Sequence, residues 1–256
     1  MQDLWRKYLL SFASIVLTSV ALLVFNKLTI WWVFLIVLLL WLGGLGYLVF
    51  LRNHKKNFKQ SLFLLLTTAV SFLSLILLLE IVWIKYFVSI LLIGVLFFLI
   101  FTSQEKSALS YLDKPLRRFI VMLWVMNLFC LVSFFFAVDL FFQNISFWLI
   151  GLIISLLAGL VSVNIWKNYF SSSFRSFLFW FILVVLLAWE ISWVLHFLPF
   201  GYLVLGFLFT WVWYIINLLI RFNLTAQGII WEKQLFFLIS NFILYFLFLF
   251  FFVRWI

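Results

Sequence analysis

The feature that most constrains this chain is the length of its apolar segments. The longest runs from residue 61 to residue 102 and contains only two charged residues, Glu80 and Lys85. As one helix, its 42 residues would extend about 63 Å. That is twice the roughly 30 Å of a bilayer's hydrocarbon core. The run therefore predicts two membrane-spanning helices joined by a tight hairpin between Glu80 and Lys85.

The composition of the whole chain points the same way. Of the 256 residues, 69% are apolar and only 9% are charged, whereas a soluble globular domain carries roughly 25% charged residues. A water-soluble fold is therefore excluded, and two prolines, nine glycines and one cysteine exclude a collagen-like or disulfide-rich scaffold. We expect an all-α, polytopic integral membrane helix bundle that forms a single membrane domain over residues 1–256.

Eight polar breaks divide the sequence into nine segments of about the length that a membrane-spanning helix needs. The predicted spans lie at about 8–25, 30–51, 61–79, 86–102, 119–138, 147–166, 176–197, 202–220 and 235–253.

The positions of lysine and arginine predict the orientation, because these residues favour the cytoplasmic ends of short loops. With the N-terminus in the cytoplasm, fourteen of the 17 basic residues fall inside, and only Lys27, Lys85 and Arg254 fall outside. We therefore expect a cytoplasmic N-terminus, an outside C-terminus, and the plasma membrane of a prokaryote as the location. This topology accounts for the net charge of +10, so membrane lipids and other membrane subunits are the expected partners, and nucleic acid is not.

Several kinds of membrane chemistry need residues that this chain lacks. A zinc protease of the His-Glu-x-x-His type and a bis-histidine haem both need paired histidines, but the only two are His54, in a predicted loop, and His196, near the end of a span. A retinal Schiff base needs a buried lysine, and none is predicted. We expect no catalytic residues, no metal and no cofactor.

Glu190 is the one ionisable residue well inside a predicted span. It lies nine residues before Pro199, about 13 Å below the outer end of its helix, where a charge costs about 2.5–3.5 kcal/mol. We expect the carboxyl group to point into the bundle, toward the eighth or ninth predicted span, with Thr210 or Tyr245 within reach as a hydrogen-bonding partner. Two interpretations stay open: a proton or substrate site, or a glutamate that fixes helix packing. His196 is a further candidate for a proton relay, although helical geometry places it away from Glu190.

Small residues recur in the sixth predicted span. Gly151, Ser155 and Gly159 are spaced every four residues, which places them on one face of a helix. Small residues at this spacing let two membrane helices approach closely. We interpret the three as helix-packing residues.

The C-terminal part of the chain carries a set of short aromatic motifs. They are Ala188-Trp189-Glu190 followed by Trp193, the segment 197–201 (Phe-Leu-Pro-Phe-Gly), the polar connection 221–234 and the ending Val253-Arg254-Trp255. Over about the last 70 residues, the chain resembles uncharacterised multipass membrane proteins of candidate-phylum (Patescibacteria-type) bacteria. The resemblance implies a multipass membrane protein and supplies no activity.

These features favour a non-enzymatic scaffold or subunit of a membrane complex, because most polar residues inside the predicted spans are amides and hydroxyls. The alternative is a transporter or channel for a small or lipid-like substrate, with an outward-side site around Glu190. A membrane-embedded enzyme is the third hypothesis. A packed interior would favour the scaffold, and a polar tunnel reaching Glu190 would favour the carrier.

Overall fold

A computed structural model describes residues 2–25, 31–52, 58–102, 114–142, 144–170, 174–225 and 231–251. Within these ranges all regular secondary structure is helical. The helices are α1 (Gln2–Phe25), α2 (Trp31–Arg52), α3 (Phe58–Leu78), α4 (Val82–Thr102), α5 (Lys114–Phe141), α6 (Phe147–Lys167), α7 (Phe174–His196), α8 (Tyr202–Asn223) and α9 (Trp231–Phe251).

Eight of these helices, α1 to α8, are long and apolar enough to cross a membrane. In α9 the corresponding apolar segment is shorter, Gln234–Phe250. The prediction of an all-α bundle of membrane-length helices is therefore confirmed for the described residues. The ninth span and the orientation of the termini stay predictions.

The hairpin predicted between Glu80 and Lys85 is confirmed. Helix α3 ends at Leu78 and α4 begins at Val82, and the two helices pack against each other. The break is shorter than predicted, because the Lys85 amide already donates to the Ile81 carbonyl over 3.0 Å. Other helices also extend beyond the predicted spans, as at the start of α1 and α5. Hydropathy marks only the apolar part of a helix, whereas the backbone hydrogen bonds continue into its polar ends.

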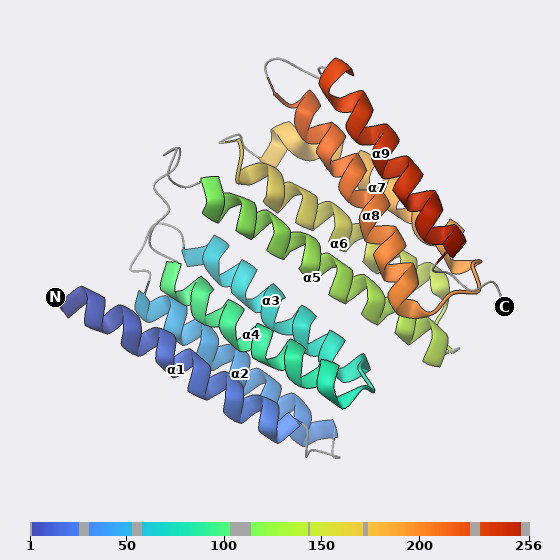
Figure 1. Ribbon diagram of the computed structural model, residues 1–256. Helices are drawn as coiled ribbons and strands as arrows, with labels where there is room; N and C mark the ends of the chain where they lie inside the picture. The colour runs from blue at the N-terminus through green and yellow to red at the C-terminus, as the bar shows by residue number, and fades with distance from the viewer. Residues whose placement is uncertain are drawn as a thin grey trace. The chain divides into compact units, whose positions relative to one another are not determined.

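The chain divides into two compact units, residues 1–123 and 124–256. In the first, α1 packs against α2 and α4, and α3 packs against the same two helices, so that α1 to α4 run alongside one another (Figure 1). Side chains buried at the centre of this unit include Trp41, Leu45, Ala69, Leu92 and Leu96. The sequence analysis predicts a single membrane domain. This prediction concerns the association of the two units, and it stays a prediction.

A buried arginine closes one end of the first unit. The Arg52 guanidinium, at the end of α2, donates from Nη2 to the carbonyl oxygen of Phe101 over 3.0 Å, and its side chain is buried. Phe101 lies in the last turn of α4, where the backbone carbonyls have no partner within the helix and carry partial negative charge. Arg52 therefore caps the C-terminus of α4.

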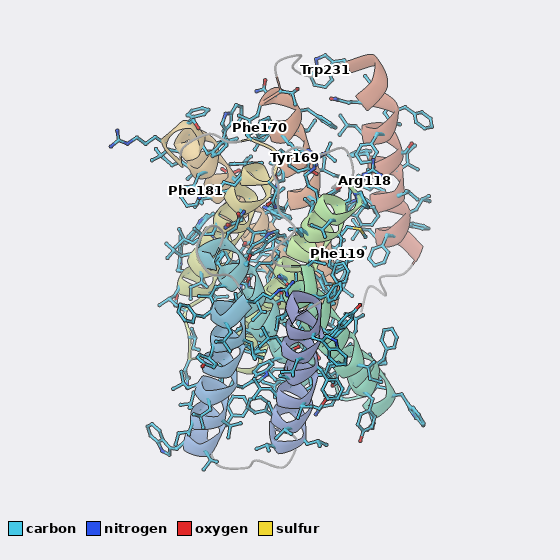
Figure 2. All side chains as sticks on the ribbon, turned by 90° about the vertical axis from the view of Figure 1, so that its left-hand side faces the viewer. Arg118, Phe119, Tyr169, Phe170, Phe181 and Trp231 are labelled. Carbon is cyan, nitrogen blue, oxygen red and sulfur yellow. The ribbon has the colours of Figure 1, made fainter. Side chains whose placement is uncertain are left out.

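In the second unit, α6 packs against α7 and α8, and α7 also packs against α8. Gly159 allows the close approach of α6 to α7, because a Cβ atom there would lie 2.6 Å from Val185 and 2.7 Å from Phe181. Phe181 is labelled in Figure 2. Gly151 is also buried, but a Cβ atom there would meet only Phe147 of its own helix.

A network of buried polar side chains joins α6 to α8. The Trp166 indole N–H donates to Asn217 Oδ1 over 2.7 Å. Ser162 Oγ accepts from Trp213 Nε1 over 3.1 Å and from Asn217 Nδ2 over 3.2 Å, and it donates to the Ala158 carbonyl over 2.8 Å. A hydroxyl group offers one donor and two acceptor lone pairs, so the Ser162 hydroxyl is fully satisfied.

Candidate functional site

Glu190 does not point into the bundle. Its side chain is exposed on α7, whereas the buried face of that helix runs through Ala188 and Ser192. Each residue advances about 100° around a helix, so Glu190 lies about 200° from both and on the opposite side. The expectation that its carboxyl group faces α8 or α9 is therefore wrong. Counting along a span gives depth, but it does not give rotation about the helix axis.

The two predicted partners of Glu190 have other contacts. The Thr210 hydroxyl is buried and donates to the Gly206 carbonyl in its own helix over 2.8 Å. The Tyr245 ring packs edge-on against Trp211, with centroids 5.6 Å apart. Among the described residues neither one is hydrogen bonded to Glu190. Their role in a proton or substrate site stays a prediction.

His196 instead pairs with Asp139, a residue that the sequence analysis did not select. His196 Nδ1 lies 2.8 Å from Asp139 Oδ2. The imidazole ring also stacks on Phe147, with centroids 3.9 Å apart and planes inclined by 19°. These two contacts hold the ring in place. Because Asp139 accepts at Nδ1, a neutral His196 carries its proton there and leaves Nε2 as an acceptor.

The Asp139–His196 pair lines a pocket of about 720 Å³. Four helix ends surround the pocket: the C-termini of α5 and α7, and the N-termini of α6 and α8. We name it the helix-end pocket. Its lining consists of Phe136, Asp139, Leu140, Ile145, Ser146, Phe147, His196, Leu198, Pro199, Phe200, Gly201, Tyr202 and Leu205.

Two short connections form one rim of this pocket. Between α7 and α8 the chain turns through Pro199 and Gly201, a combination that ends one helix and starts the next. Between α5 and α6, Ser146 immediately precedes the first residue of α6. Short connections place consecutive helices antiparallel, so these four helix ends meet at one end of the second unit.

The lining has the character of a small-molecule site, because it is mostly apolar and aromatic with a few polar groups. Among the lining residues that the structure describes, Asp139 is the one acidic side chain, and lysine and arginine do not occur. With a neutral histidine the Asp139–His196 pair carries one negative charge, and with a protonated histidine it carries none. The described residues contain no group of three or more His, Cys, Asp or Glu side chains that could hold a metal ion.

Of the four predicted site residues, only His196 lines the helix-end pocket. The signal for Asp139 was present in the sequence, because Asp139 and His196 end two predicted spans on the same side of the membrane. Hydropathy does not say which helix ends are neighbours, and the packing of α5 to α8 supplies that information.

Comparisons of this chain with protein families, with curated proteins and with solved structures found no match.

Proposed function

We propose that this integral membrane protein is a non-enzymatic subunit or scaffold of a complex in the plasma membrane of a prokaryote, with its N-terminus in the cytoplasm and its C-terminus outside. The observation that carries the proposal is a carboxyl group on an exposed apolar face. Glu190 shares one side of α7 with four exposed apolar residues. We call this side the α7 stripe, and it consists of Phe179, Ile182, Leu186, Glu190 and Val194.

A carboxylate on such a stripe is unfavourable when lipid covers it. Leu186 and Val194, one turn to either side of Glu190, are 60% and 65% exposed, so this part of α7 presents apolar surface. A charge within the hydrocarbon costs about 2.5–3.5 kcal/mol. A neighbouring protein that covers the stripe and offers a hydrogen-bond donor removes most of this cost.

The occupant that fits the α7 stripe is a membrane-spanning helix of another subunit, with a lysine or arginine at the depth of Glu190. Apolar side chains would pack against Leu186 and Val194, and the basic group would pair with the carboxylate. A charged pair of this kind gives shorter and stronger hydrogen bonds than two neutral groups do. The carboxylate also selects the partner, because a helix without a donor at that depth leaves the charge unpaired.

The alternative proposal is a carrier or channel with its site around Glu190, and a membrane-embedded enzyme comes third. A carrier needs a water path to the carboxyl group, and the helix-end pocket is not lined by Glu190, Thr210 or Tyr245. The substitution Glu190→Gln separates the first two proposals. It keeps the shape of the side chain and an oxygen that accepts hydrogen bonds but cannot release a proton. A docked helix therefore stays bound through a weaker hydrogen bond, whereas proton-coupled transport is lost.

Crosslinking in native membranes tests the docking role. A photoreactive amino acid is placed at Leu186 or Val194, next to Glu190, and as a matched control at Leu152 or Leu156, two exposed leucines of α6. We expect the first pair to form one common crosslinked product that the α6 positions do not form. The product should decrease at least tenfold in Glu190→Leu.

Charge exchange then tests the chemistry of that contact. Glu190→Lys should abolish the crosslinked product, and replacing the partner's basic residue by glutamate should restore it. Identical crosslinking from α6 and α7, or a product that does not depend on residue 190, would contradict the proposal. A reporter fused after Ile256 tests the orientation separately, because activity confined to the cytoplasm would contradict an outside C-terminus.

A further inference from the structure

We propose that the helix-end pocket binds an organic ammonium ion, with the Asp139 carboxylate as its counter-ion and His196 as the residue that positions this carboxylate. The pocket and the α7 stripe are different surfaces. The inference therefore does not depend on the docking role proposed above, and each can fail without the other.

The size and lining of the pocket fit a small amphiphilic ligand. Its volume of about 720 Å³ lies within the roughly 300–1,000 Å³ of typical ligand sites. Apolar surface for the hydrocarbon or aromatic part of such a ligand comes from Leu140, Leu198 and Leu205. Asp139 supplies the charged group, and 17% of its side chain remains exposed although one oxygen contacts His196.

The charges around the pocket favour a cation over an anion. Asp139 is an acid, and the described residues that line the pocket include no lysine or arginine. Two helix N-termini and two C-termini meet here, so their opposite partial charges offset one another. The sign of the site is therefore decided by the Asp139–His196 pair.

Aromatic side chains add to this preference. Phe136, Phe147, Phe200 and Tyr202 line the same pocket, and the faces of aromatic rings attract cations, quaternary and primary ammonium groups among them. A carboxylate surrounded by aromatic side chains binds ammonium groups. The same carboxylate repels a ligand that carries a carboxylate or phosphate group.

Dansylcadaverine is a suitable probe, because it joins a primary ammonium group to an aromatic body that fluoresces more strongly in an apolar site. Its binding to the full-length protein is measured in dodecyl maltoside micelles, with the N-acetylated, uncharged form as the control ligand. We expect saturable binding that is at least tenfold tighter than that of the acetylated form.

Three variants connect this binding to the pocket. Asp139→Asn should weaken binding at least tenfold, whereas Glu80→Gln, a matched loss of one exposed carboxylate that does not line the pocket, should leave it unchanged. His196→Gln removes the imidazole that contacts Asp139 but keeps the carboxylate, so it should retain binding. This variant keeps the proposal testable if Asp139→Asn does not fold. The proposal would be overturned by binding that is equal for the charged and acetylated probes, that survives Asp139→Asn in a folded protein, or that is lost in His196→Gln.

The ammonium group could belong to a lipid headgroup or to a free amine, and the same assay distinguishes these sources. Phosphatidylethanolamine added to the micelles should compete with the probe through Asp139 if the site recognises a lipid headgroup. If the site recognises soluble amines, phenethylamine should compete and the lipid should not. Competition by neither would contradict the proposed ligand class.

Discussion

Replacing Ser162 by alanine tests whether the polar network between α6 and α8 stabilises the second unit. The substitution removes one oxygen atom from a fully buried position and leaves the helical backbone unchanged. It removes the acceptor of two hydrogen bonds from α8, those of Trp213 over 3.1 Å and Asn217 over 3.2 Å. Asn217 keeps its hydrogen bond with Trp166, so the substitution removes one part of the network and leaves the other part in place.

The expected loss of stability follows from the two donors, Trp213 Nε1 and Asn217 Nδ2, that lose their acceptor when Ser162 is replaced. An interhelical hydrogen bond in a membrane protein contributes about 0.6 kcal/mol on average and about 1.7 kcal/mol at most. Two such bonds give about 1.2 kcal/mol as the central value and about 3.4 kcal/mol as the upper limit. We therefore expect Ser162→Ala to lower the free energy of unfolding by about 1–3 kcal/mol.

Ser155→Ala is the matched control, since Ser155 lies on the same helix and is equally buried. Its hydroxyl group donates to the Leu152 carbonyl of its own helix over 2.9 Å. We expect this control to change the free energy of unfolding by less than about 0.5 kcal/mol. Reversible unfolding in mixed micelles, with increasing denaturing detergent, measures both variants.

A double-mutant cycle with Trp213→Phe isolates the Ser162 contact with the Trp213 indole N–H. If that contact stabilises the unit, Ser162→Ala should cost less in the Trp213→Phe background, with a coupling energy of about 0.6–1.7 kcal/mol. Equal losses in Ser162→Ala and Ser155→Ala, together with no coupling to Trp213, would refute the reasoning.

Further predictions concern helix contacts in each unit. Gly206→Ala should lower the free energy of unfolding by about 1–3 kcal/mol, because its Cβ atom would lie 3.0 Å from the Cα atom of Ser133. Gly94→Ala should be neutral in the same unfolding assay, since the added carbon would meet no atom within 4 Å beyond its chain neighbours and the nearby backbone of its own helix. Arg52→Met should remove the hydrogen bond to the Phe101 carbonyl, at about 1.5–3 kcal/mol for a charged donor, and accelerate amide hydrogen exchange at the C-terminus of α4. Unchanged exchange there would show that Arg52 does not cap α4.

The helical type and approximate length of the elements followed largely from the sequence. Each predicted span has a corresponding helix in the structure, and the hairpin in the run 61–102 lies at the predicted place. The physical reason is that a bilayer core offers no hydrogen bonds to the backbone. An apolar segment of about 20 residues must therefore satisfy its own amides and carbonyls, and it does so as a helix. Helix formation therefore depends on the composition along the chain, which can be read from a single sequence.

The direction in which each side chain points was decided by tertiary packing. Glu190 is exposed on α7 although its depth suggested an inward carboxyl group, and His196 meets Asp139 across the ends of α5 and α7. In a soluble helix the alternation of polar and apolar residues would show the buried face. A membrane helix is apolar on nearly every side, because lipid and protein interior have similar polarity, so that signal is weak. Which helices are neighbours, and how each is rotated, depends on the close contacts made by residues such as Gly159 and Gly206.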